Sequence, residues 1–223
     1  MKMLKTTVAC GLLAVSTLAS AEHHLGTFSA NVALTSDYVF RGISQTDNDP
    51  AIQGGFDWNH GSGVYAGVWG SNIDEDFLGA NLELDTYVGF STDIGGFGID
   101  VGFIHYDYPG GPSGGDVDEV YLGASFGPFS AKYSEGVEFV NGTTDLGNYL
   151  ELGADFELPW ELGLGLHVGQ YDFKDGGDYV DWKLALSKQV SNFTFELGYT
   201  DTDEKDFGDI GDERFILSVS ASL

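Results

Sequence analysis

The chain contains 223 residues, of which 35 are acidic and 9 are basic, and its formal net charge is −26 at pH 7. Because nucleic-acid phosphates are neutralised by clusters of Lys and Arg, so acidic a chain is not expected to bind nucleic acid. After residue 21, no apolar run approaches the ~20 residues that a membrane-spanning helix requires. If the protein crosses a membrane, we therefore expect it to do so with strands.

Residues 1–21 have the pattern of a secretory signal peptide. Two lysines precede the apolar run from Val8 to Leu18, which is followed by the small residues Ala19-Ser20-Ala21. We predict cleavage after residue 21 and one domain over residues 22–223, since no linker or change of composition marks a boundary. The only cysteine, Cys10, lies within the signal peptide. The mature chain is therefore expected to have no disulfide and no cysteine metal site.

The mature chain alternates apolar and polar residues over segments of strand length. In residues 28–41, Phe28, Ala30 and Val32 fall on one face, and Ser29 and Asn31 on the other. This period of two predicts a strand that is buried on one face only. Twelve such segments follow one another, at residues 28–41, 51–59, 63–72, 80–93, 97–107, 117–127, 129–134, 149–158, 161–173, 180–188, 192–200 and 213–223.

The connections between these segments are alternately long and short. The long ones, most of them acidic, are residues 45–50, 73–79, 108–116, 135–148, 174–178 and 201–212. The short ones are residues 60–62, 95–96, 127–128, 159–160 and 189–191, most of them rich in turn-forming residues. This alternation predicts an antiparallel up-and-down transmembrane β-barrel of about twelve strands, with short periplasmic turns and longer acidic external loops.

A soluble sandwich or lipocalin-like barrel would show the same alternation with its apolar residues turned inward. Two features favour the membrane barrel. The polar face is rich in glycine, which suits a confined lumen, and aromatic residues collect near strand ends, as in the interfacial girdles of membrane barrels. The aromatic residues concerned are Tyr38, Phe40, Trp58, Trp160, Phe173 and Tyr199.

The last segment alternates from Phe215 to Leu223, the final residue of the chain. It is similar to the C-terminal strand by which the barrel assembly machinery recognises outer-membrane barrels. Such strands usually end in Phe, so Leu223 departs from the pattern.

The stretch Asn31 to Ser71 contains the segments SDYVFRGISQ and QGGFDW. These segments resemble the TorF family of porins, long described as bacterial proteins of unknown function, and the likeness continues to Tyr199-Thr200-Asp201-Thr202-Asp203. The resemblance implies an outer-membrane porin of a Gram-negative bacterium, for which we expect no cofactor and no enzymatic activity.

If the apolar face meets lipid, the charged residues of the other face line the lumen. This predicted pore-lining set comprises Asp37, Arg41, Asp57, Glu83, Asp85, Asp100, Glu119, Lys132, Glu151, Asp155, Lys183, Glu196 and Arg214. The set is net negative, so a narrow pore would concentrate small cations. Alternatively, Asp37 with Arg41, or Glu151 with Lys132, would pair and plug the lumen, because unpaired buried charge is costly.

Arg41 and Asp37 lie on the same polar face near the first external loop. They would either form part of a constriction or make an ion pair at the end of their strand. Tyr65 and Trp69 fall on the inward phase of the third segment and would either line the pore or belong to a girdle.

Carboxylates crowd in the external connections, for example at Asp74-Glu75-Asp76 and between Asp201 and Glu213. Such oxygen clusters bind divalent cations, which would bridge the loops to lipopolysaccharide phosphates. None of them matches a known calcium loop, and a solvated acidic surface is the simpler interpretation. A closed barrel acting as an adhesin or receptor through these loops is the alternative to a channel. No catalytic motif unites His60, His105 or His167 with a nucleophile.

Overall fold

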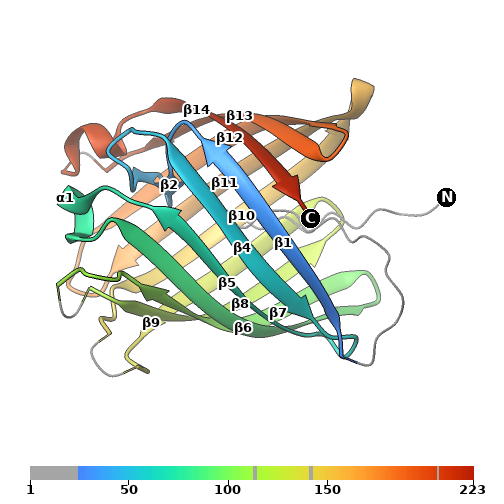
Figure 1. Cartoon of the computed structure of the whole chain (residues 1–223), viewed down its shortest axis with the longest axis horizontal. Coiled ribbons are helices and arrows are strands. Elements are labelled where there is room, and N and C mark those ends of the chain that lie inside the picture. Colours follow the sequence, from blue (N-terminus) through green and yellow to red (C-terminus); the bar gives the residue numbers. More distant parts are fainter. Residues whose placement is uncertain (1–24, 113–114, 141–142, 205) are drawn as a thin grey trace.

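The computed structural model describes residues 25–112, 115–140, 143–204 and 206–223, and twelve strands of these residues form one closed antiparallel barrel (Figure 1). The barrel strands are β1 (Thr27–Thr35), β4 (Ala51–Asn59), β5 (Val64–Asn72), β6 (Leu82–Ile94), β7 (Phe97–Asp107), β8 (Val117–Phe126), β9 (Phe129–Val137), β10 (Gly147–Leu158), β11 (Leu162–Phe173), β12 (Asp178–Val190), β13 (Phe193–Thr202) and β14 (Arg214–Ser222). Each strand pairs with the next in the chain, and β14 pairs with β1 to close the barrel. The predicted all-β, up-and-down barrel is confirmed. The predicted signal peptide lies outside the described residues.

The remaining elements lie in the connections. Two short strands, β2 (Val39–Phe40) and β3 (Ile43–Ser44), pair within the first connection, and α1 (Glu75–Leu78) follows β5. Two short 3-10 turns, η1 (Pro159–Glu161) and η2 (Gly208–Gly211), lie in later connections. Among the described residues, no helix is long and apolar enough to cross a membrane.

The predicted alternation of long and short connections is present. The long connections and α1 gather at one end of the barrel, at the left of Figure 1. The predicted strand 28–41 is too long, because β1 ends at Thr35 and the chain then turns inward. After Thr35, Tyr38 and Phe40 still fall on the apolar phase and Asp37 and Arg41 on the polar phase, so the pattern alone did not reveal the turn.

The outer surface of the barrel is apolar and the inner face is polar. On β4, Phe56 is 68% exposed, and on β14 Leu217 is 60% exposed, whereas the inward residues Glu83 and Asp85 of β6 are buried. A soluble protein would hide these apolar side chains, whereas a lipid environment solvates them. The interpretation as a soluble barrel with an apolar core is therefore wrong.

Aromatic side chains lie on the outer surface near both ends of the barrel. Tyr199 contacts both Trp182 and Phe215 toward the end with the long loops, and Phe97 stacks on Phe126 beside the short turns. Three of the residues predicted for the girdles lie elsewhere, because they pack in clusters with inward-facing side chains. These residues are Tyr38, Phe40 and Phe173.

The glycines of the inner face make room for tyrosine rings. Tyr65 lies over Gly89 and Tyr87 lies over Gly67, in both cases directly across the β5–β6 pairing. A β-carbon at either glycine would overlap the ring. The tyrosines therefore lie flat along the wall, and their hydroxyl groups reach carboxylates two strands away: Tyr87 donates to Asp57 at 2.5 Å and Tyr65 to Asp100 at 2.7 Å.

Candidate functional site: a hairpin inside the lumen

The first long connection, residues 36–50, folds into the barrel as a hairpin. Val39 pairs with Ser44 and Phe40 with Ile43, which leaves Arg41 and Gly42 as the two turn residues. Both have positive φ angles, 48° and 79°. Two-residue turns with positive φ at both positions match the twist of a hairpin and favour glycine. The segment Phe40-Arg41-Gly42-Ile43 therefore encodes a tight reversal.

The tip of this hairpin lies against the wall formed by β12 and β13. A β-carbon at Gly42 would lie 2.6 Å from Cβ of Asp181 and 3.3 Å from Cβ of Thr202. Tyr179 of β12 donates a hydrogen bond to the carbonyl oxygen of Arg41 at 2.9 Å. Glycine is therefore required at position 42 for close approach as well as for its backbone angle.

Arg41 joins the tip to yet another part of the wall. Its two terminal nitrogens donate to the two carboxylate oxygens of Glu119 on β8, both at 2.7 Å. The guanidinium carbon lies 4.4 Å from the ring centroid of Tyr149 and 5.2 Å from that of Tyr171. The side chains of Arg41 and Glu119 are only 8% and 5% exposed. Such a bidentate, ring-stacked arrangement is specific to arginine.

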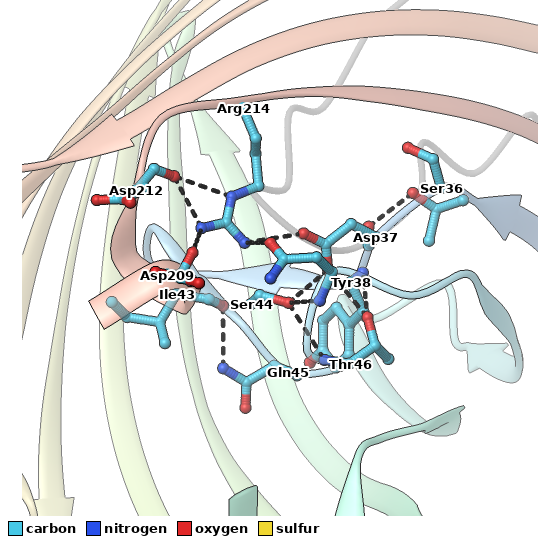
Figure 2. Close-up of polar contacts among 12 residues, drawn as sticks. Ser36, Asp37, Tyr38, Ile43, Ser44, Gln45, Thr46, Asp209, Asp212 and Arg214 are labelled. Carbon is cyan, nitrogen blue, oxygen red and sulfur yellow. Dashed lines mark hydrogen bonds and ion pairs between the residues drawn. The ribbon is translucent and has the colours of Figure 1, made fainter. Parts of the chain in front are cut away.

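The predicted ion pair between Asp37 and Arg41 is not present. The prediction assumed that both residues belong to one strand, whereas both lie in the inward connection. Asp37 instead accepts hydrogen bonds from Ser44 at 2.6 Å, Thr46 at 2.9 Å and Arg214 at 3.0 Å (Figure 2).

Arg214, the first residue of β14, also donates to the carbonyl oxygens of Asp209 and Asp212. The base of the hairpin is therefore tied to the last external loop.

Tyr38 attaches the hairpin to a third side of the wall. Its hydroxyl donates to Glu83 of β6 at 2.8 Å, and its ring packs edge-on against Trp69 of β5, with centroids 5.4 Å apart. Trp69 is buried and faces the lumen, as Tyr65 does through its bond to Asp100. Both residues therefore lie on the inner face of the barrel and do not belong to a girdle.

The other predicted pore-lining residues also lie on the inner face of the barrel wall. Lys132 lies 3.6 Å from Glu151, and Lys183 donates to Glu196 at 2.7 Å. Asp155 follows Glu151 on the inward phase of β10. The pair predicted between Glu151 and Lys132 is present, and each of the two lysines on this half of the wall lies beside a carboxylate.

Two buried carboxylates were missing from the predicted set. Asp181 of β12 lies inside the barrel, where one carboxylate oxygen accepts a hydrogen bond from the Tyr149 hydroxyl at 2.7 Å. Its other oxygen lies 2.9 Å from Nε2 of His167. Asp181 lies on the polar phase of its strand, so the alternation could have placed it in the predicted pore-lining set. Asp118 lies on the outward phase of β8, where it is covered by the connection after β9 and bonded to Val140, Thr143 and His105. No local pattern marks that contact.

Neighbouring external connections are joined by hydrogen bonds and ion pairs. Lys174, between β11 and β12, lies 2.6 Å from Asp145 and 3.6 Å from Glu138, both between β9 and β10. The hydrogen bond with Asp145 raises the pKa of Lys174 above its ordinary value. In the described parts of the chain, no group of three or more His, Cys, Asp or Glu side chains is arranged to hold a metal ion.

The chain belongs to the family described as "Bacterial protein of unknown function (Gcw_chp)", whose model matches residues 19–223. A search of curated protein sequences finds no match. Among solved structures, the KdgM porin superposes with a TM-score of 0.60 at 11% identity, covering 87% of this chain and 99% of that one. The NanC porin superposes with a TM-score of 0.60 at 10% identity, covering 88% of this chain and 100% of that one.

A further structure, the "KdgM porin in complex with disordered oligogalacturonate", has a TM-score of 0.58 at 10% identity and covers 88% of this chain and 98% of its own. At these identities the likeness concerns the fold, and it supports the predicted twelve-stranded barrel.

Proposed function

We propose that this member of the Gcw_chp family is an outer-membrane channel through which small hydrophilic solutes diffuse passively, with the hairpin of residues 36–50 as its constriction. The observation that carries the proposal is the reversal of the usual protein pattern, with an apolar outside and a charged, tyrosine-lined inside. The barrel architecture shared with the KdgM and NanC porins supports it. No enzymatic activity and no cofactor form part of this proposal.

The charge of the lumen supports a preference for cations. The predicted pore-lining set contains nine carboxylates and four basic side chains. Several carboxylates, including Asp57 and Asp100, are bonded by tyrosine hydroxyls, which do not neutralise them. A confined negative lumen concentrates cations and repels anions. The solute is therefore expected to differ from an acidic oligosaccharide such as the oligogalacturonate named with the KdgM porin.

We propose that residues 1–21 are removed as a signal peptide and that the strand ending near Leu223 is recognised by the barrel assembly machinery. External carboxylates would share divalent cations with lipopolysaccharide phosphates, since the described loop residues do not form a metal site by themselves. The TorF resemblance fits this assignment, although the matching family model carries no such name.

Solute uptake into vesicles tests the proposal. The refolded barrel is inserted into liposomes, and swelling is followed in neutral, cationic and anionic solutes of similar size. We expect swelling with neutral and cationic solutes, and slower swelling with anionic ones. An inserted barrel that admits none of these solutes would contradict the proposal.

A closed barrel that acts through its external loops is the second candidate. The observation that favours it is the dense packing of the hairpin, whose Arg41–Glu119 and Arg214–Asp37 pairs are largely buried. In that case the barrel would be a scaffold for an adhesin or receptor, and solute uptake would be absent from properly folded protein.

A further inference from the structure

One wall of the lumen lacks basic side chains altogether. No Lys or Arg occurs between Arg41 and Lys132, a span that includes β4, β5, β6, β7 and β8. The inward carboxylates of this wall that are buried or half-buried are Asp57, Glu83, Asp85, Asp100 and Glu119. Any compensating charge must therefore come from the hairpin, from the opposite wall or from a solute.

Four of these five carboxylates have a partner. Tyr87 donates to Asp57, Tyr65 to Asp100 and Tyr38 to Glu83, and Arg41 neutralises Glu119. Asp85 is the exception. Its side chain is buried, at 4% exposure, and Oδ1 has no hydrogen-bond partner among the described residues.

An unpaired carboxylate at this depth is costly, so it either takes up a proton or holds a cation. A second carboxylate, Glu83, lies two residues away on the same inward face, where Tyr38 covers it. Two ionised carboxylates this close repel each other, and either a shared proton or a bound cation relieves that repulsion. The surroundings of Asp85 decide between the two.

The neighbours of Asp85 are aromatic. Trp69 of β5 and Tyr106 of β7 are its direct cross-strand partners, and Tyr87 follows it on the same face of β6. The ring of Tyr38 packs against Trp69 from the hairpin side. Electron-rich rings next to a carboxylate suit an ammonium group, whose N–H donors would satisfy the carboxylate while its positive charge meets the ring faces.

We infer that Asp85, together with Glu83 and the rings of Trp69, Tyr87 and Tyr106, forms a binding site for a small primary ammonium cation on the acidic wall of the lumen. The inference deepens the proposed function, on which it rests for the solute path, by naming the class of solute that the channel prefers.

Binding is measured on the intact refolded barrel in detergent, at pH 7.5 and constant chloride concentration. The midpoint of thermal unfolding is followed while sodium is replaced by methylammonium, or by tetramethylammonium, which has no N–H donor. We expect methylammonium to raise the midpoint more than either other cation. If methylammonium raises the midpoint of the wild-type barrel no more than sodium or tetramethylammonium does, the inference is overturned. That result would indicate that Asp85 holds a proton and not a cation.

Three variants locate the site. Asp85→Asn removes an unpaired charge and should fold, and we expect it to weaken methylammonium binding by about tenfold or more. Trp69→Leu should weaken it while leaving Asp85 in place. Asp107→Asn, which removes an outward-facing carboxylate from neighbouring β7, is the matched control and should bind as the wild type does. Unchanged binding by Asp85→Asn would also overturn the inference.

Conductance in planar bilayers is recorded separately. Binding without conductance would mean that the site exists and the channel proposal fails. If the barrel conducts but methylammonium binding does not depend on Asp85, the channel proposal stands and the proposed site does not.

Discussion

Arg41 holds the tip of the hairpin against the wall through two hydrogen bonds to Glu119 and contacts with three aromatic rings. At this scale the sequence predicted which side of the wall a charged residue faces, because alternation encodes it. It did not predict the partner of Arg41, because Glu119 lies 78 positions away and is brought close only by barrel closure and the inward turn at Ser36.

Replacing Arg41 by alanine should be strongly destabilising. Glu119 would remain buried without a counter-charge, which costs about 3–5 kcal/mol. The free energy of unfolding in urea, measured in lipid vesicles, checks this. Adding Glu119→Gln to Arg41→Ala should recover part of the loss, and equal stabilities of Arg41→Ala and wild type would contradict the assigned pairing.

Gly67 should not tolerate alanine, because the added methyl group would meet the ring of Tyr87, which is held in place by Asp57. We expect Gly67→Ala to lower the free energy of unfolding by about 1–3 kcal/mol. Gly61 is the control, since a β-carbon there meets no atom within 4 Å. The tyrosine-over-glycine arrangement would be contradicted if both variants unfolded alike.

Eleven of the twelve barrel strands were predicted to within three residues at each end, because each alternates over its length and ends at a turn signal or a charged loop. The first was extended past its end at Thr35. The hairpin of residues 36–50 was not predictable in this way. Tyr38 and Phe40 continue the apolar phase of β1, so the local pattern of a strand and of an inward hairpin is the same. Only the contacts of Tyr38 with Glu83 and Trp69 distinguish them.

The base of the hairpin depends on Asp37, which accepts from Ser44, Thr46 and Arg214. Asp37→Ala should free the hairpin and expose Arg41, the only tryptic site between Lys5 and Lys132. Loss of a hydrogen bond to a charged group, about 1.5–3 kcal/mol, should speed cleavage there by about tenfold or more. Limited trypsin digestion of the folded barrel measures this rate.

The exposed Asp49, which lies in the same connection, provides the control. Asp49→Ala should be cleaved at the wild-type rate. Cleavage of Asp37→Ala at that same rate would show that the contacts of Asp37 do not hold the hairpin.

The whole barrel combines an apolar outer surface with an acidic lumen, and the sequence predicted both properties because each sums over many residues. The uneven distribution of charge inside was also present in the sequence, as the span without Lys or Arg between Arg41 and Lys132. The sequence alone did not show that this span forms one acidic wall. That follows from the strand order, which places β4 to β8 side by side.

The acidic lumen should make the channel cation-selective. In a potassium chloride gradient the reversal potential should indicate preference for potassium, and the preference should decrease as salt screens the lumen. Asp155→Lys, on the inner face of β10, should shift the reversal potential toward chloride. Asp172→Lys, on the outward phase of β11, should leave it unchanged. Chloride selectivity of the wild type would contradict this view of the lumen.

Single-channel conductance in a planar bilayer tests the central claim most directly, when the wild type is compared with a variant in which residues 39–44 are replaced by two glycines. We predict small discrete steps for the wild type and larger steps for the shortened variant, because the hairpin narrows the lumen. Equal conductance of the two barrels, or silence from both after verified insertion, would contradict a channel constricted by this hairpin.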